Sequence, residues 1–190
     1  MTETYRYDVE VLHLLVSPGH AYFGRARDGA ADVPTTDAEQ VEVVAGKGIV
    51  GDRFFGKAAH MDAAVTLFAV EALEAIAEEL DAGPFDPLLT RRNVILRGAH
   101  LAPLLGQDFT LESQGNVVRF RGGRPAHPCA WMDRMLAPGA HAAMRGRGGM
   151  RCHALSDGVL HRGPAVLVSP VPLQPGQAGV PSVLRPGRLP

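Results

Sequence analysis

The sequence predicts a mainly β fold with short helices, an α+β chain whose strands close into a β-barrel. Many short apolar and β-branched segments are separated by Gly, Pro and Asn turn signals. A single long segment, 70–80, has a helical period. Hydrophobic residues make up 46% of 190 residues, enough apolar material for one core. We therefore expect one barrel domain with helical insertions.

The expected strands of the first half surround this helix. Its apolar residues Leu73, Ile76 and Leu80 share one face, and Gly83-Pro84 ends it. Residues 19–38, rich in Gly, Ala and Asp, are expected to form a loop. The strands are expected at 9–16, 40–45, 64–68 and 93–96.

Two hairpins and a short helix are expected in the second half. The first hairpin turns over 113–116, because Val118 and Phe120 alternate with arginines. The second turns over Ser156-Asp157-Gly158. The helix is expected to begin near Pro128 and to end at Leu136. The strands are expected at 109–112, 117–121, 150–155, 159–161 and 165–168.

The composition changes after residue 168. Closely spaced prolines and glycines cannot sustain a ladder or a helix, so residues 169–190 are predicted to form a disordered tail. Residues 1–168 are expected to form the domain.

Charge, cysteine content and hydropathy exclude several classes of protein. A net charge of −1 and a pI near 6.7 argue against nucleic-acid binding. Two cysteines are too few for a disulfide framework. No signal peptide and no membrane-length apolar stretch is recognisable. We expect a cytoplasmic protein with reduced thiols.

The basic residues are mostly arginine, with seventeen arginines and two lysines. Coding bias explains such a ratio as a whole, but arginine also suits bidentate binding of phosphate and carboxylate. Three groups of arginines lie near turns, at 91–92, at 119, 121 and 124, and at 145–147.

Cys129 is the best candidate for chemistry. It follows Pro128 at an expected helix start, where free backbone N–H groups stabilise a thiolate, and His127 could add a hydrogen bond. A nucleophile or soft-metal ligand and a small buried hydrophobe are both open for this residue. Cys152, inside an expected strand, favours the buried hydrophobe.

Other chemistries fit less well. The spacing of His127, Cys129, Cys152 and His153 is too tight for structural zinc. No G-x-S-x-G elbow is present. An acyl-transfer enzyme with Cys129 and one of the eight histidines stays open, because nothing in the sequence selects a histidine.

Taken in order, several segments resemble the MOSC domain, named after the C-terminal region of molybdenum cofactor sulfurases. The resemblance extends from about Val9 to Val168, and order and spacing carry it. The matching segments are 48–53 (GIVGDR), 65–68 with 71–73, 92–95 (RNVI) with Gly98, Pro128-Cys129, 145–149 (RGRGG) and 157–163.

The resemblance implies a β-barrel of the pyruvate-kinase barrel type and a role for Cys129. In the family this thiolate ligates molybdenum beside the dithiolene sulfurs of a pterin cofactor, or carries a persulfide. Arg92 and Asn93 match the segment that helps to hold the cofactor phosphate. Arg145 and Arg147 are further candidates for that phosphate. Asp52 and Arg53 begin a second signature that lines the same mouth or stabilises a turn.

The sequence also departs from the family pattern. Phe54-Phe55-Gly56 stands where some members have two histidines before glycine, which puts transfer of a detailed reductase site in doubt. Gly163-Pro164 stands where Gly-Asp is frequent. The chain lacks the pyridoxal-phosphate domain of larger relatives, so that cofactor is not expected here.

Three functions follow as hypotheses. The first is a molybdenum-cofactor protein that reduces N-hydroxylated small molecules with electrons from a separate donor protein, with His127 as the nearest candidate acid. The second is a sulfur carrier that holds a persulfide on Cys129. The third is a binding module without a cofactor.

Overall fold

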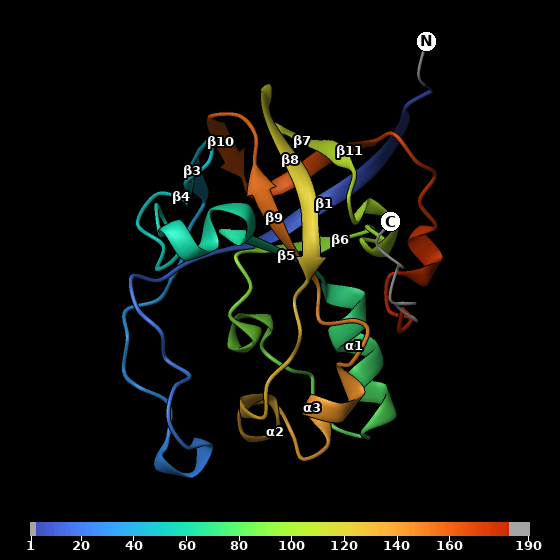
Figure 1. Ribbon diagram of the computed structural model, residues 1–190. Coiled ribbons are helices and arrows are strands. Elements are labelled where there is room, and N and C mark those ends of the chain that lie inside the picture. The colour runs from blue at the N-terminus through green and yellow to red at the C-terminus, as the bar shows by residue number, and fades with distance from the viewer. Residues whose placement is uncertain (1–2, 183–190) are drawn as a thin grey trace, which may run out of the picture.

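Seven strands close into a barrel in the computed structural model, which describes residues 3–182 (Figure 1). The barrel order is β11-β7-β8-β9-β5-β6-β1, and pairing of β1 with β11 closes it. All neighbouring pairs are antiparallel except β5–β6. A second sheet has the order β10-β3-β4. The mainly β barrel expected from the sequence is confirmed.

The strands are β1 (Tyr5–Val16), β2 (Thr36–Asp37), β3 (Gln40–Val44), β4 (Gly48–Ile49), β5 (Val65–Ala69), β6 (Val94–Arg97), β7 (Asp108–Ser113), β8 (Asn116–Pro125), β9 (Met150–Ala154), β10 (Gly158–His161) and β11 (Gly163–Ser169). The α-helices are α1 (Val70–Glu79), α2 (Trp131–Met135) and α3 (Ala140–Ala143). The 3-10 helices are η1 (Ala26–Asp28), η2 (Ala58–Ala63), η3 (Pro87–Thr90), η4 (Ala102–Leu104) and η5 (Pro175–Gln177).

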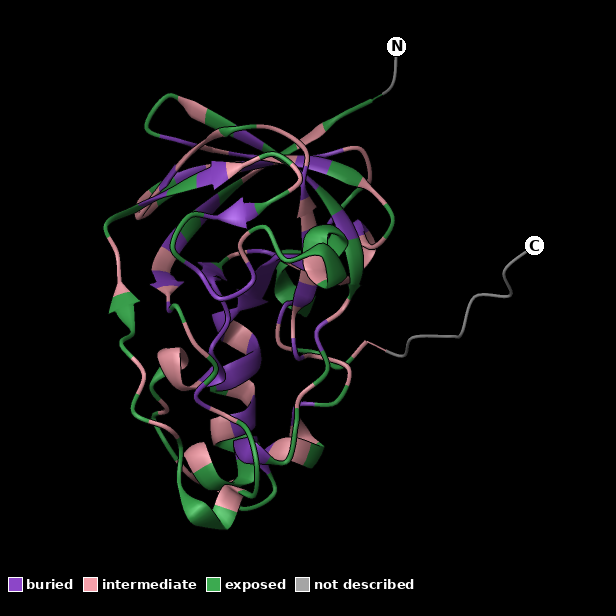
Figure 2. Ribbon diagram, turned by 60° about the vertical axis from the view of Figure 1, so that its left-hand side comes forward, coloured by how far each residue is buried: buried purple, intermediate pink, exposed green. Residues whose placement is uncertain are grey.

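The core has two parts. Alternate residues of the strands fill the barrel, among them Leu67, Phe120 and Leu167. A second cluster lies below it, where Ile76 of α1 and Trp131 of α2 pack with the underside of the barrel. Figure 2 shows buried residues in both regions, with mostly exposed and intermediate residues around them. The three α-helices therefore cover one end of the barrel (Figure 1).

One of the two expected hairpins differs from the structure. The first hairpin is confirmed, since β7 pairs with β8 across Ser113 and Asn116. The second hairpin is wrong: β9 pairs with β8 and β5, whereas β10 pairs with β3. The Ser-Asp-Gly turn leads the chain from one sheet to the other. A turn signal in the sequence predicts the turn but not which strand the next segment pairs with.

The segment after β11 also differs from the prediction of a disordered tail. Over 169–182 it packs on the barrel, and Leu173 and Ala178 are buried in the core. Leu173 N donates to Tyr7 Oη (2.6 Å), and Ser182 N donates to Gly146 O (2.8 Å). Proline prevents regular structure there but does not prevent burial. The remainder of the expected tail, 183–190, lies outside the described residues.

We expect Leu173→Ala to lower the free energy of unfolding by about 2–4 kcal/mol, because it leaves a cavity beneath the 169–182 segment. Urea unfolding followed by circular dichroism measures this. Val180→Ala is the matched control, since Val180 is 48% exposed, and it should change stability by less than about 0.5 kcal/mol. Equal effects of the two variants would contradict this packing.

Candidate functional site

Cys129 lies on an exposed segment between β8 and α2, and its side chain is accessible. The helix begins at Trp131, later than expected, and Cys129 O accepts from Met132 N (2.9 Å). Tyr22 stacks on Trp131, with ring centroids 5.3 Å apart. Burial raises the pKa of Tyr22 to about 12, Arg91 partly offsets this rise, and Cys129 adds slightly to it.

Arg92 ties the Cys129 segment to the glycine-rich loop 146–149. Its Nε donates to Gly148 O (3.0 Å), and its Nη2 donates to Ala126 O (3.1 Å) and His127 O (3.3 Å). Burial, together with repulsion from Arg151, lowers the pKa of Arg92 to about 10, and Cys129 partly offsets this. Arg92 therefore supports the backbone of the Cys129 segment and places a buried positive charge against it.

Asn93 is fully buried and uses its whole side chain inside the fold. Its Oδ1 accepts from Thr66 N (3.0 Å) and Thr66 Oγ1 (2.8 Å). Its Nδ2 donates to Leu15 O (3.2 Å) and Asp52 Oδ2 (3.0 Å). Within residues 3–182 the Asn93 side chain therefore links β5, β6 and the Asp52 turn, and its role in holding the cofactor phosphate stays a prediction.

Asp52 and Arg53 form a buried ion pair on the segment between β4 and η2. Arg53 Nη1 donates to Asp52 Oδ2 at 3.2 Å, and Arg53 Nη2 donates to Arg91 O at 3.0 Å. Asp52 also caps its own turn, since its Oδ1 accepts from Phe54 N (3.2 Å). Burial lowers the pKa of Arg53, and Asp52 partly offsets this.

Arg91 belongs to the same cluster, although the sequence pointed to its neighbour. It has a left-handed backbone (φ 54°), and its Nη2 donates to Ser17 Oγ (2.8 Å) and Gly19 O (2.9 Å). Its guanidinium lies 5.6 Å from the centre of the Tyr22 ring. The pair of adjacent arginines is visible in the sequence. The positive φ that directs Arg91 toward the 17–22 loop is not.

Arg151 of β9 is the residue that sequence reasoning missed. Its guanidinium lies 5.6 Å from the centre of the Phe54 ring, and Arg53 lies 4.6 Å from the same ring. His20 and His60 make edge-on contacts with this ring, at 5.2 and 4.8 Å. Two histidines from distant segments thus surround Phe54, which occupies a position where some family members have histidine.

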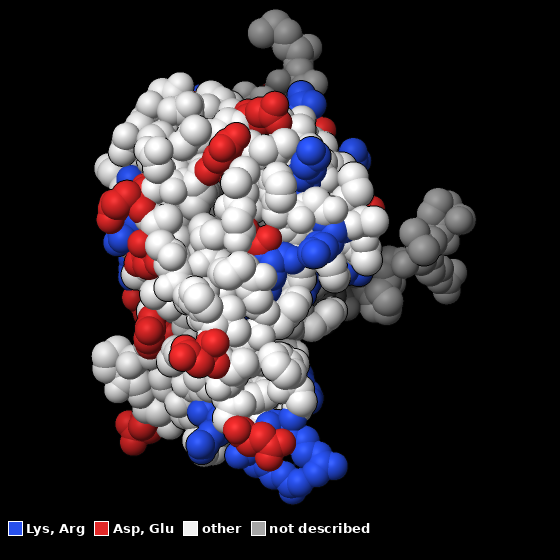
Figure 3. All heavy atoms as spheres, turned by 90° about the vertical axis from the view of Figure 1, so that its left-hand side faces the viewer, with Lys and Arg blue, Asp and Glu red and all other residues white. Residues whose placement is uncertain are grey.

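The surface charges do not single out this site. Figure 3 shows acidic and basic side chains interspersed over one face of the molecule, with a basic group at its lower end. The distinctive arginines are instead the buried ones, Arg53, Arg91 and Arg92, each 9% exposed. Coding bias does not explain why three arginines are buried side by side.

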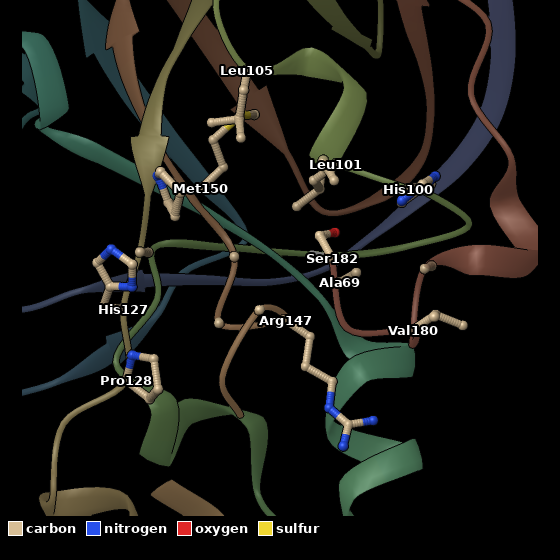
Figure 4. A pocket seen from close by; sticks show the side chains of 17 residues that line it. Ala69, His100, Leu101, Leu105, His127, Pro128, Arg147, Met150, Val180 and Ser182 are labelled. Atoms are coloured by element: carbon tan, nitrogen blue, oxygen red, sulfur yellow. The ribbon is translucent and has the colours of Figure 1, made fainter. Parts of the chain in front are cut away.

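The structure does not bring Arg145 and Arg147 to Cys129. Arg145 is exposed. Arg147 Nη2 pairs with Glu79, its Nε donates to Ala143 O (2.7 Å), and its Nη1 donates to Gly179 O (3.1 Å). In Figure 4 the Arg147 side chain runs away from His127. Its guanidinium joins α1 to the 169–182 segment, so the expected phosphate contact is not supported by its position.

His127 has an exposed side chain on the Cys129 segment and lines the pocket drawn in Figure 4. Leu101, Leu105, Met150 and Val180 supply much of the apolar wall. The pocket holds about 60 Å³, room for a few water molecules but far too little for a pterin cofactor. His127 as a proton donor stays a prediction.

His100, in the same pocket, gives a pH dependence. Burial lowers its pKa below the ordinary 6.5, so folding favours the neutral ring. As pH falls through about 6.5 the unfolded chain binds the proton first, and stability is lost. We expect His100→Gln to flatten the decline of the urea midpoint between pH 7 and 5. An unchanged slope of the urea midpoint against pH would show that other titratable groups cause the decline.

The two cysteines are expected to differ in reactivity. Cys129 is exposed, whereas Cys152 is completely buried, and burial raises the pKa of the Cys152 thiol well above its ordinary value. The sequence expectation for Cys152 is thus confirmed. Iodoacetamide should alkylate the native protein once, at Cys129, and twice after denaturation. Peptide mass spectrometry checks this, and native modification of Cys152 would contradict it.

Two further features limit the chemistry. Within residues 3–182 no three His, Cys, Asp or Glu side chains come together in a way that could hold a metal ion by themselves. A metal at Cys129 therefore needs ligands that the described chain does not supply. No helix in the same range is long and apolar enough to span a membrane.

Comparisons with known proteins agree with this architecture. Similar solved structures include the YuaD protein from Bacillus subtilis, with a TM-score of 0.65 and 17% identity over 89% of this chain and 98% of that one. YiiM from Geobacillus stearothermophilus has a TM-score of 0.58 and 18% identity, over 84% and 74%. YiiM from Escherichia coli has a TM-score of 0.54 and 17% identity, over 92% and 76%. At these identities the likeness shows the fold.

A comparison with curated protein sequences gives no significant match. The model of the MOSC domain family matches residues 46–167, well over half of the chain. The match includes Asp52, Arg92 and Cys129. The resemblance seen in the motifs is thereby confirmed, and the chain belongs to the MOSC domain family.

Proposed function

We propose that this protein binds a molybdenum–pterin cofactor at Cys129 and reduces N-hydroxylated small molecules with electrons from a separate donor protein. The observation that carries the proposal is an exposed thiol beside an excess of buried positive charge. The buried arginines are Arg53, Arg91 and Arg92, and Arg151 is partly buried. Within residues 3–182, Asp52 is the one carboxylate that pairs with any of these four, and it pairs with Arg53.

The residues present fit such a cofactor. A pterin dithiolene with a phosphate is strongly anionic, and buried guanidinium groups without a carboxylate partner, as at Arg91 and Arg92, favour anions. The cofactor's own two sulfur atoms would complete the ligand set that one cysteine begins, which explains why no cluster of side chains is needed. Arg92 would position the Cys129 segment and neutralise charge, and Asp52 with Asn93 would hold Arg53.

The reaction is balanced by two electrons and two protons. An N-hydroxylated substrate R–NH–OH, with two electrons and two protons, gives R–NH₂ and water, and the N–O bond breaks. A bound molybdenum centre supplies two electrons at one atom. The chain's part is to hold that centre through Cys129, to orient the substrate and to deliver a proton to the leaving hydroxide. His127 is the candidate for that proton, because its side chain is exposed on the same segment.

The test is elemental and pterin analysis of protein expressed in a host that makes the cofactor. We expect close to one molybdenum and one pterin per chain, and consumption of a hydroxylamino purine when a chemical reductant is supplied. Well-folded protein without molybdenum or pterin would overturn the proposal.

The exposure of Cys129 also favours the sulfur-carrier function. A thiolate that receives sulfur from a persulfide donor must be reached by that donor: Cys–S⁻ and R–S–SH give Cys–S–SH and R–S⁻. Mass spectrometry after incubation with a persulfide donor separates the two functions. A stable gain of one sulfur on Cys129, in protein that takes up no molybdenum, would favour the carrier.

A further inference from the structure

A second pocket, of about 540 Å³, lies between α1, the strands β1 and β6, and the segment 82–87 that follows the helix. Its volume is in the range of pockets that enclose small molecules, about 300–1,000 Å³. Its wall is mostly apolar and includes Leu12, Leu73 and Phe85. The side chains with polar groups that line it are His13, Glu74 and Arg97, and Cys129 does not line it.

His13 reaches this pocket because β1 carries a bulge. The pairing of β1 with β6 shifts by one residue between Val11 and His13. Val9, Val11 and Leu14 all belong to the barrel core, a spacing of two and then of three residues. In a regular strand His13 would share the face of Val11 and lie inside the barrel. The extra residue turns its ring out of the barrel and toward α1.

Asp37 of β2 holds one nitrogen atom of this ring. Its Oδ2 lies 2.8 Å from His13 Nδ1, and its Oδ1 accepts from Leu14 N at 3.1 Å. Because a carboxylate only accepts, Nδ1 carries the hydrogen, and Nε2 of the neutral ring is left as an acceptor. Among residues 3–182 no group bonds to Nε2. Asp37 itself does not line the pocket, which indicates that the ring turns its opposite edge, with Nε2, toward it.

The charged side chains around the pocket are paired with one another. Arg97 Nη1 donates to Glu74 Oε2 at 3.2 Å, and its Nη2 donates to Glu74 Oε1 at 2.5 Å. Arg162 Nη1 lies 3.4 Å from Asp37 Oδ2. The described residues that line the pocket therefore offer no unpaired charge, and a charged molecule would lose hydration there without gaining an ion pair. A neutral molecule is favoured.

We propose that this pocket binds a neutral, largely apolar alcohol or phenol. The hydroxyl group donates to His13 Nε2, and the hydrocarbon body packs against Leu73 and Phe85. Asp37 is the positioning residue, since its bond to Nδ1 keeps Nε2 an acceptor. The site does not depend on Cys129 or on a cofactor, so it stands or falls separately from the proposed function.

Two probe compounds test the site on the purified chain by isothermal titration calorimetry. 2-Naphthol has an apolar body and one hydroxyl donor, whereas 2-methoxynaphthalene has the same rings and no hydrogen to donate. We expect saturable binding of 2-naphthol, at least about tenfold tighter than that of 2-methoxynaphthalene. No saturable binding of 2-naphthol, or equal affinities for the two compounds, would overturn the proposal.

His13→Phe locates the binding, because it keeps a ring of similar shape and removes the acceptor. We expect 2-naphthol to bind at least about tenfold more weakly, with no loss of affinity for 2-methoxynaphthalene. His153→Phe is the matched control, since His153 also lies beside an aspartate, 3.6 Å from Asp62, but does not line the pocket. Wild-type affinity in His13→Phe, or an equal loss in both variants, would contradict the assignment.

Asp37→Asn tests the positioning role without touching the pocket. The asparagine oxygen is expected to keep the bond from Leu14 N, so its amide NH₂ faces His13 Nδ1. Nδ1 must then accept, and the hydrogen moves to Nε2. The preference for 2-naphthol over 2-methoxynaphthalene should fall to less than about threefold. An unchanged preference, or an equal loss of affinity for both compounds, would show that Asp37 does not set the acceptor and would refute the proposal as stated.

Discussion

Cys129→Ala is expected to abolish molybdenum retention and to lower reduction of hydroxylamino substrates by more than about 100-fold. Changes in groups that merely orient a metal ligand cost 10–100-fold in affinity or activity, and loss of the protein's own ligand should exceed that. The variant should fold normally, since Cys129 is exposed and packs little. Molybdenum content by mass spectrometry and initial rates with a chemical reductant measure the effect.

The matched control is Cys152→Ala. Cys152 is a buried core residue, so this variant should lose about 1 kcal/mol of stability and keep its molybdenum. Full cofactor content in Cys129→Ala would refute the assignment of this residue as metal ligand. Loss of molybdenum in both variants at a temperature where both are folded would show that the effect is not specific to Cys129.

Asn93→Ala is expected to lower the free energy of unfolding by about 3–5 kcal/mol, among the largest effects of any single substitution here. The change removes the acceptor of Thr66 N and Thr66 Oγ1 and one donor to Asp52 Oδ2. These groups are buried and cannot recover their bonds from water. Urea unfolding at neutral pH gives the magnitude.

Two further variants sharpen this prediction. Asn116→Ala changes the same residue type in the β7–β8 turn, where its bonds are long, at 3.3 and 3.4 Å, and should cost less than about 1 kcal/mol. Asn93→Asp keeps the shape but sets a second buried carboxylate against Asp52, and should destabilise at least as much as alanine. A loss below about 1 kcal/mol for Asn93→Ala would refute the role of this network.

The fold was largely predictable because alternation and turn signals are local. The pattern around Val118 and Phe120 correctly predicted β8, and the helical period of Ile76 and its neighbours correctly predicted α1. Strand pairing is not local. A strand that begins at Gly158 is compatible with pairing to β9 or to β3, and only the tertiary structure shows that β10 pairs with β3. Leu173 likewise stands among prolines, and its burial depends on the distant Tyr7.

The candidate site was predictable to a smaller extent. Arg92 and Cys129 stand out through the motif order, and in the structure Arg92 donates to His127 O, two residues before Cys129. Arg147 was a motif residue too, but Glu79 and two carbonyl groups occupy its guanidinium. Arg151 lay in no motif, since a single arginine in a strand looks like any solvent-facing residue.

By itself, the sequence determined the family and the barrel class and singled out Cys129 as the candidate residue, because these depend on residue order and local periodicity. The tertiary structure alone decided which of seventeen arginines surround the site. A guanidinium keeps its positive charge available to an anion when the fold buries it without a carboxylate partner, as at Arg91 and Arg92, whereas Glu79 neutralises Arg147. That distinction depends on contacts between segments far apart in the chain, which no local pattern encodes.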